Sequence, residues 1–361
     1  MTIARTLCLG FLAVILIGTL LLMLPLSSSA GTWTGPITAL FTATSAVCVT
    51  GLIVVDTGSH FSFWGQLAIA LLIQIGGLGY MASSTFLILL VRRRFDVRQK
   101  FAIQETFDGS PLQGSRNLIR SIVAMTVVFE LTGIFALLKV FVPEFGFYGG
   151  LWQAIFHSVS AWNNAGFSLF ADSLTRYQHS WTIHLIIPAL IILGGIGYQV
   201  IIEIYFWILK HLQHYPGRFD WSLNFKVVTS MTLTLLGLGT VAFFFTEFHN
   251  AATLGSLQSG EKLAAAWFQS VTTRTAGFNT IDISQLGDTA LFITMALMLV
   301  GASPSGTGGG MKTTTVRILF DCTRSTLRGI EQVAIYNRRI PTSTVLKAIA
   351  VTLGSLSAVV C

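Results

Sequence analysis

Charged residues are scarce in this sequence of 361 residues, and their scarcity decides the class of protein. Asp, Glu, Lys and Arg make up 10% of the chain, against about a quarter in ordinary globular domains. Apolar residues make up 53%, and the mean hydropathy is +0.71. A soluble chain of this length would hold about two or three domains. The composition predicts an all-α integral membrane protein instead.

Cysteine and histidine are also sparse, and neither is spaced for a metal site. The four cysteines, Cys8, Cys48, Cys322 and Cys361, lie far apart and form no C-x-x-C pair. We therefore expect neither a zinc site nor a disulfide framework. The seven histidines form no ligand set. Because no Ser–His–Asp or paired-carboxylate arrangement is present either, we predict that the chain is not an enzyme and holds no covalently bound cofactor.

The few charges are mostly basic, and their positions predict an orientation. Of 22 Lys and Arg residues, 17 lie at the N-terminus or in and beside the linkers around 92–120, 210–226 and 317–347. Basic residues favour the cytoplasmic side of a membrane. We predict a multi-pass plasma-membrane protein with a cytoplasmic N-terminus. The net charge of +7 then reflects orientation beside anionic membrane lipids, and we expect no nucleic-acid partner.

Three short stretches, residues 46–52, 162–167 and 273–278, share one design. Each ends a short amphipathic run and contains a single glycine, and the three glycines are 115 and 111 residues apart. Irregular backbone at membrane depth survives only where protein buries it or water wets it. Rings of backbone carbonyls are how cation filters are built. We therefore predict an ion-binding selectivity filter at Val49, Thr50, Gly51, Asn164, Ala165, Gly166, Thr275, Ala276 and Gly277.

Apolar segments around these stretches predict a repeated helix–pore loop–helix unit around a central pore. Three complete repeats and the start of a fourth are expected. We predict repeats over 1–94, 117–210 and 223–320, cytoplasmic linkers over 95–116, 211–222 and 321–343, and the start of a fourth repeat over 344–361. Residues 1–26 could pass for a signal peptide, but they are long enough for a span of about 20 residues. We favour a retained first helix.

Glycine clusters at 76–79 and 194–197 mark the second span of the first two repeats. Small residues let membrane helices approach closely, so we interpret both clusters as packing sites. We expect residues 63–91 and 181–209 each to form one long span.

The third repeat differs, because five glycines and a proline fall within residues 301–311. Glycine costs about 1 kcal/mol and proline about 3 kcal/mol in a helix interior, so the segment should unwind. A phosphate loop is excluded, since Met311 separates Gly310 from Lys312 and no strand precedes the glycines. We predict a flexible gating loop over 301–312. Its gating residues are Gly306, Gly308, Gly309, Gly310 and Lys312, the last repelling cations or tethering the loop.

Several other charged residues lie near the predicted pore. Arg274 lies within the third stretch and is expected to donate to carbonyls or carboxylates behind the filter. Three aspartates, Asp56, Asp172 and Asp282, follow the glycines by five, six and five residues. They are either helix caps or an acidic vestibule that concentrates cations. Glu130 lies within a span with no obvious partner, which suggests proton coupling, whereas Glu203 is expected to pair with Lys210 or a linker arginine.

Four stretches together resemble the Trk/Ktr/HKT superfamily of potassium transporters: residues 49–52, 163–167, 273–278 and 306–312. No helices precede the first repeat, so the chain resembles in particular the KtrB subunit of bacterial Ktr systems. The resemblance implies a potassium filter with an intramembrane gate below it. It also implies a homodimer and a cytoplasmic, nucleotide-binding regulatory ring of the KtrA type. Sodium dependence is implied for some members.

The family has four repeats, whereas this sequence ends within the first helix of the fourth. We expect a truncated sequence whose filter lacks one side. Potassium uptake is the function that these patterns favour. The alternative is a proton- or sodium-coupled secondary transporter of another substrate, which would require discontinuous helices in inverted pairs.

Overall fold

The computed structural model describes the chain except for residues 1–2, 93–110, 214–218, 331 and 361. Most of the predicted linker 95–116 and part of the linker 211–222 lie outside the described residues. The longer helices are α1 (Ile3–Met23), α2 (Pro36–Val47), α4 (Phe63–Arg92), α6 (Pro111–Trp162), α7 (Trp181–Ile196), α8 (Tyr198–Leu212), α9 (Leu223–Glu247), α10 (Ser259–Thr272), α11 (Asp288–Leu299), α12 (Thr313–Leu327) and α13 (Thr342–Val360). The short elements are α3 (Thr57–His60), three 3₁₀ turns (Pro25–Ser27, Thr175–Tyr177 and Ile283–Gln285), and a hairpin of β1 (Ala334–Ile335) and β2 (Arg338–Arg339).

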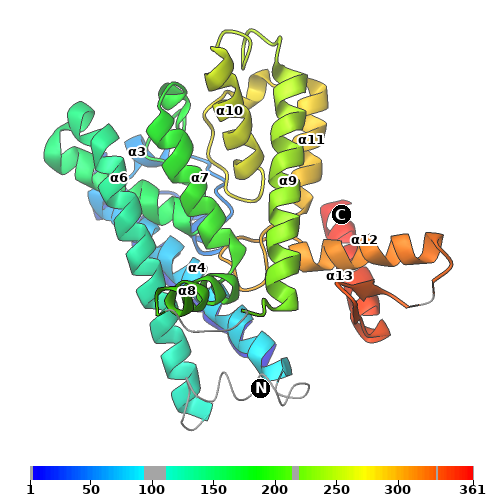
Figure 1. Cartoon of the computed structure of the whole chain (residues 1–361). Helices are drawn as coiled ribbons and strands as arrows, with labels where there is room; N and C mark the ends of the chain where they lie inside the picture. Colours follow the sequence, from blue (N-terminus) through cyan, green and yellow to red (C-terminus); the bar gives the residue numbers. More distant parts are fainter. Residues whose placement is uncertain (1–2, 93–110, 214–218, 331, 361) are drawn as a thin grey trace.

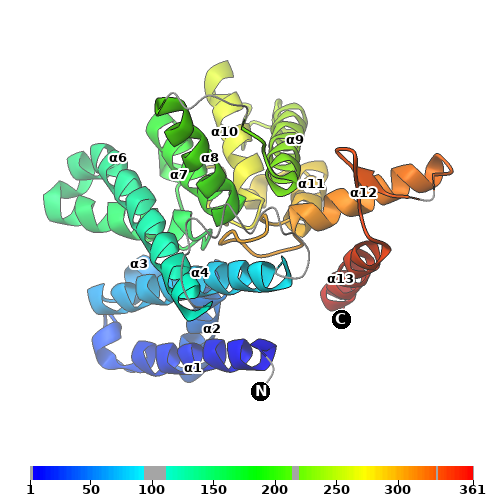
Figure 2. The same cartoon turned by 60° about the horizontal axis from the view of Figure 1, so that its bottom comes forward.

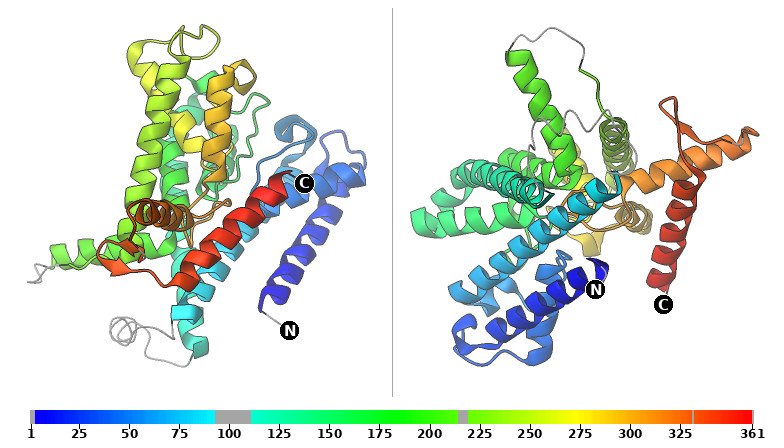
Figure 3. Two further views of the ribbon diagram at one scale, coloured as in Figure 1. Left: turned by 90° about the vertical axis from the view of Figure 1, so that its right-hand side faces the viewer. Right: turned by 90° about the horizontal axis from the view of Figure 1, so that it is seen from below.

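The same order of elements occurs three times along the chain. A long helix is followed by a short helix, an irregular turn and a second apolar segment, as in α1, α2 and α4. In the second unit α6 supplies both of the first two helices, because it bends at Gly146, whose φ is 70°. Seen from below, the three units follow one another around the molecule, from blue through green to orange (Figure 3). The protein is mostly helical, as the sequence predicts.

Several helices have the length and composition of membrane spans. Within the described residues, three pass that test: Phe63–Ala82, Leu118–Trp162 and Leu223–Glu247. The bent pair α7–α8 makes a fourth if it counts as one span. The short helices that precede the first and third turns, α2 and α10, are only 12 and 14 residues long. At about 1.5 Å per residue they cannot cross a core of about 30 Å.

The second span of the second unit is broken, contrary to the prediction of one helix over 181–209. Helices α7 and α8 meet at Gly197 with a bend of 102°. Gly197 has φ 95° and ψ 142°, which glycine tolerates far better than other residues. Figure 1 shows α8 turned sharply away from α7 at the lower end of α7. The glycine cluster at 194–197 therefore contains a kink, whereas the sequence predicts only a site of close helix packing.

The third unit ends in two helices with an irregular stretch between them. Helix α11 stops at Leu299, an irregular stretch follows, and α12 begins at Thr313. Figures 1 and 2 show α12 running outward across α9 rather than continuing the direction of α11. The irregular stretch, residues 300–312, is called the intramembrane loop below.

The second and third units each insert an aromatic residue into the core of the unit before them. Phe167, just after the second turn, is fully buried in a cluster built mainly from α1, α2 and α4. Phe278, just after the third turn, is fully buried in the cluster of α6 and α7. Burying a phenylalanine side chain stabilises by about 1.5–3 kcal/mol. The irregular turns are therefore anchored on their outer side by neighbouring cores.

Candidate functional site

The three irregular turns have the same backbone conformation. Each contains a non-glycine residue with positive φ two positions before its glycine. The φ values are 57° and 73° at Val49 and Gly51, 57° and 70° at Asn164 and Gly166, and 68° and 86° at Thr275 and Gly277. The residue between them keeps the usual negative sign. The left-handed conformation costs about 1 kcal/mol or more at the non-glycine residue of each turn. Contacts with the surrounding structure therefore have to stabilise each turn.

The three turns lie side by side. A Cβ placed on Gly51 would come 2.6 Å from the carbonyl oxygen of Ala165 and 3.3 Å from the Gly166 Cα. A Cβ on Gly166 would come 2.5 Å from the carbonyl oxygen of Ala276 and 3.0 Å from the Gly277 Cα. The structure thus brings together the nine residues predicted from sequence in three separate stretches. The space between neighbouring turns therefore leaves no room for a side chain at Gly51 or Gly166.

Hydroxyl groups at the ends of the short helices hold these turns, and sequence reasoning missed them. The Ser160 hydroxyl donates to the carbonyl oxygen of Phe167 at 2.7 Å, and the Thr272 hydroxyl donates to that of Phe278 at 2.7 Å. In the first turn the Thr50 hydroxyl donates to the Ser45 hydroxyl at 2.9 Å. The signal was available, because a Ser or Thr stands five or six residues before each glycine.

The intramembrane loop is bound to the break between α7 and α8. The Ser303 N–H donates to the Gly195 carbonyl at 2.9 Å, and the Thr307 N–H donates to the Gly194 carbonyl at 3.0 Å. In return the Tyr198 N–H donates to the Ser305 carbonyl at 3.0 Å. Backbone groups left unpaired by the break are therefore satisfied by the loop, as burial requires.

The same loop touches the second and third turns. The Thr307 hydroxyl donates to the Trp162 carbonyl at 3.0 Å and accepts from the Asn164 amide at 3.2 Å. A Cβ on Gly308 would lie 2.8 Å from the Thr275 hydroxyl and 3.0 Å from the Asn164 amide nitrogen. Gly306 lies against the backbone of Gly195. The loop is therefore packed directly against the predicted filter.

Lys312 and Arg274 both bind the loop. The Lys312 ammonium donates to the Gly308 carbonyl at 2.8 Å and lies 4.7 Å from the centre of the Tyr80 ring. Lys312 is predicted either to repel cations or to tether the loop, and this contact is the one expected of a tether. Arg274 is 8% exposed and donates to the Gly301 carbonyl at 3.4 Å; its structural role behind the filter stays a prediction. Of the remaining loop glycines, Gly310 has φ 71° and Gly309 has open space beside it.

The three aspartates lie in the segments that follow the turns, and each has a local partner. Asp56 caps α3 through the Ser59 N–H at 3.0 Å. Asp282 accepts from the N–H and hydroxyl of Ser284 at 2.9 and 2.7 Å. Both therefore form the caps that the sequence allowed. A common vestibule stays a prediction.

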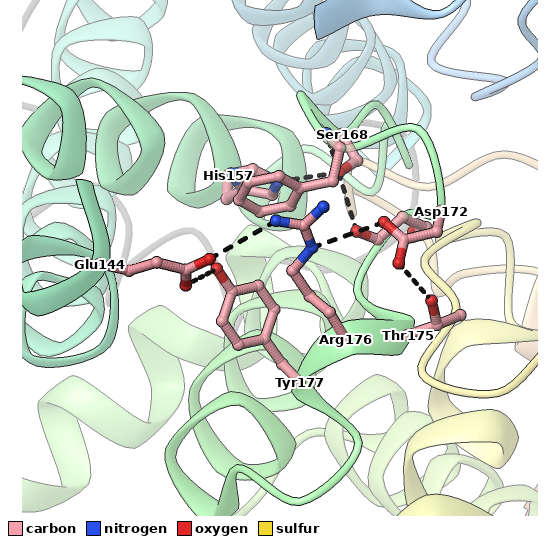
Figure 4. A network of polar contacts seen from close by, with 9 residues as sticks. Glu144, His157, Ser168, Asp172, Thr175, Arg176 and Tyr177 are labelled. Atoms are coloured by element: carbon pink, nitrogen blue, oxygen red, sulfur yellow. Dashed lines mark hydrogen bonds and ion pairs between the residues drawn. The ribbon is translucent and has the colours of Figure 1, made fainter.

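Asp172 belongs to a polar network on the second unit, shown in Figure 4. Its carboxylate accepts from Thr175 at 2.8 Å and lies 3.7 Å from the Arg176 guanidinium. Arg176 also reaches Glu144 at 3.5 Å, and the Tyr177 hydroxyl donates to Glu144 at 2.6 Å. Burial, reinforced by this hydrogen bond, raises the pKa of Tyr177, so the hydroxyl keeps its proton at neutral pH. The half-exposed ion pairs are worth at most about 1 kcal/mol.

Two glutamates have partners that the sequence did not predict. Glu203, expected to pair with a basic side chain, accepts from the N–H and hydroxyl of Ser222 at 3.1 and 2.6 Å. Glu130, for which the sequence offered no partner, accepts from the amides of Gln74 and Asn163 at 3.2 and 3.3 Å. Neither contact could be inferred from sequence, because the partners lie 19, 56 and 33 residues away.

The sequence was compared with protein families and with known proteins. The model of the TrkH family, described as cation transport protein, matches residues 5–360. The Ktr system potassium uptake protein B of Bacillus subtilis is 37% identical over 98% of this chain and 77% of its own length. Its namesake in Vibrio alginolyticus is 39% identical over 97% of this chain and 75% of its own length. The potassium/sodium uptake protein NtpJ of Enterococcus hirae is 38% identical over 96% of this chain.

A solved structure shares the fold. The crystal structure of the potassium transporter TrkH from Vibrio parahaemolyticus matches with a TM-score of 0.70 at 19% identity. The match covers 94% of this chain and 68% of that one. The match to the family model spans nearly the whole sequence, and the relatives exceed a third identity over nearly all of it. The chain therefore belongs to the TrkH family of cation transport proteins.

Proposed function

We propose that this chain is the ion-conducting subunit of a potassium uptake system in the plasma membrane. The observation that carries the proposal is the meeting of three left-handed glycine turns, drawn from residues 49–51, 164–166 and 275–277. Carbonyl oxygens gathered at membrane depth can replace the hydration shell of a cation. No comparable cluster of side-chain ligands competes for this role, since the described residues contain no metal-binding group of His, Cys, Asp or Glu.

Ions would enter from outside, lose water between the three turns and pass inward when the intramembrane loop moves. An inward-negative potential favours this by about 2.3 kcal/mol per charge per 100 mV. The names of the Ktr and NtpJ relatives support potassium as the ion, with sodium as a second transported or coupling ion. In this scheme Gly306, Gly308, Gly309, Gly310 and Lys312 form the gate.

The relatives' description as parts of a Ktr system supports a multi-component assembly. We place this chain in a homodimer with a cytoplasmic regulatory ring of the KtrA type, and with its N-terminus on the cytoplasmic side. The division of the sequence into repeats and linkers stated above belongs to the same proposal.

Replacing a filter glycine tests the proposed ion site. Gly166→Ala adds a Cβ at a left-handed position, which costs about 1–2 kcal/mol, and directs it 2.5 Å from the Ala276 carbonyl. We expect proteoliposomes with the wild-type chain to take up potassium in preference to sodium. The variant should lower that preference by about tenfold.

Gly31→Ala is the matched control, because Gly31 has a similar φ of 68° with nothing within 4 Å of an added Cβ. It should keep the wild-type preference. Absence of potassium uptake by the wild-type chain, or equal selectivity in all three proteins, would contradict the proposal.

Loosening the intramembrane loop tests the proposed gate. Thr307→Val removes the hydroxyl that joins the loop to Trp162 and Asn164. Each such bond is worth about 0.5–1.5 kcal/mol, so potassium flux should rise about two- to tenfold. The control is Thr323→Val, which removes a similar hydroxyl-to-carbonyl bond at an exposed position of α12. An unchanged flux in Thr307→Val at equal protein amounts would show that the loop does not limit passage.

Neutralising the three aspartates tests the vestibule. Asn retains the capping geometry, so a combined Asp56→Asn, Asp172→Asn and Asp282→Asn variant should fold normally. Potassium uptake should fall mainly at low ionic strength, because a charged entrance concentrates cations only where salt does not screen it. Uptake measured between about 10 and 300 mM inert salt checks this. An equal loss at every salt concentration would rule the vestibule out.

A further inference from the structure

Equivalent positions in the units can be identified from their contacts. In the second unit the Ser158 hydroxyl donates to the Glu130 carbonyl at 2.8 Å. In the third unit the Ser270 hydroxyl donates to the Leu236 carbonyl at 2.9 Å. The same two serines lie against Gly133 and Gly239, each three residues further along its helix. Glu130 of α6 and Leu236 of α9 are therefore counterparts.

The remaining counterparts follow in the same way. Asn163 and Arg274 each stand three residues before a turn glycine. Gly76 lies against the carbonyl of Val47, as Gly194 lies against that of Trp162. Gln74 and Ile192, each two residues earlier, are thus equivalent.

The junction between the first two units is polar, whereas the next junction is not. At the first junction the Asn163 amide donates to Gln74 at 2.8 Å and to Glu130 at 3.3 Å. The Gln74 amide donates to the other Glu130 oxygen at 3.2 Å. At the second junction the equivalent residues Ile192, Leu236 and Arg274 line a small pocket and form no such network. The carboxylate of Glu130 is thus an addition to the shared scaffold, which folds elsewhere without it.

The Glu130 carboxylate is buried without a cation to offset it. Glu130 is 7% exposed and Asn163 is fully buried. In the part of the chain that the structure describes, Glu130 forms no ion pair with Lys, Arg or His. Buried polar groups of this kind are tolerated only when hydrogen-bonded in a fixed geometry. The two amides that bind Glu130 are consequently held in place by it.

Asn163 transmits this constraint to the ion pathway. The next residue, Asn164, is the left-handed residue of the second turn, with φ 57°. The second turn is also the central one, in contact with Gly51 on one side and Gly277 on the other. A shift of Asn163 would therefore move the backbone that faces both neighbouring turns.

We propose that Glu130 is a positioning residue for selectivity. Through hydrogen bonds to Asn163 and Gln74, it sets the spacing of the second turn against its neighbours. The inference rests on the proposed potassium pathway. It assigns the width of that pathway to side chains that lie outside the pathway. Acceptance of hydrogen bonds matters here, and the negative charge does not.

The test compares potassium and sodium uptake by the full chain in proteoliposomes. Glu130→Gln keeps one of the two acceptor oxygens and should lower the uptake ratio by only about threefold. Glu130→Leu, which copies the third unit, and Asn163→Leu should each lower the ratio by about tenfold. The double variant Glu130→Leu/Asn163→Leu should lower the uptake ratio no further than Asn163→Leu alone, because Glu130 acts on the turn through Asn163. Glu203→Leu, which removes a carboxylate remote from the turns, is the control and should keep the wild-type ratio.

Three results would overturn the inference: a wild-type ratio in Glu130→Leu, equal loss in Glu130→Gln and Glu130→Leu, or additive losses in the double variant. If Glu130→Leu does not accumulate in the membrane, Gln74→Leu replaces it, and an unchanged ratio there also overturns the inference. A wild-type chain without potassium uptake would defeat the proposed function itself. That outcome is distinct, since it is read before any variant is compared.

Discussion

Irregular backbone inside a membrane protein has to be paired with protein groups or lie against water or an ion, and this constraint organises the proposed pathway. The three turns do not continue into helix, so their carbonyls and N–H groups cannot be satisfied by the regular helical pattern. The hydroxyls of Ser160 and Thr272 bind the carbonyls of Phe167 and Phe278, which directly follow two of the turns. In the proposed pathway, the remaining carbonyls of the turns face the ion, which would be their partner as it passes.

The intramembrane loop obeys the same constraint from below. Breaking the span at Gly197 exposes the carbonyls of Gly194 and Gly195, and the loop N–H groups of Thr307 and Ser303 cover them. The proposed filter and the proposed gate thus share one requirement, which side-chain hydroxyls meet at the turns and backbone N–H groups meet at the loop.

Much of this arrangement was predictable from sequence because it is local. A single glycine after a short amphipathic run predicts a turn at each of the three places, and the density of glycine at 301–311 predicts an unwound segment. The break at Gly197 was not predictable. Gly79 occupies the same place in an almost identical motif, yet α4 continues through it. The difference comes from a contact with Ser305, more than a hundred residues away. The partners of Glu130 escaped prediction for the same reason.

The central claim is that the three turns together bind a dehydrated monovalent cation. The most direct measurement is the anomalous signal of Rb⁺ or Tl⁺ in crystals of the protein grown with the ion in place of K⁺. The account predicts a peak surrounded by carbonyl oxygens of residues 49–51, 164–166 and 275–277. A saturating ion that left no peak there, or that bound only elsewhere, would contradict it.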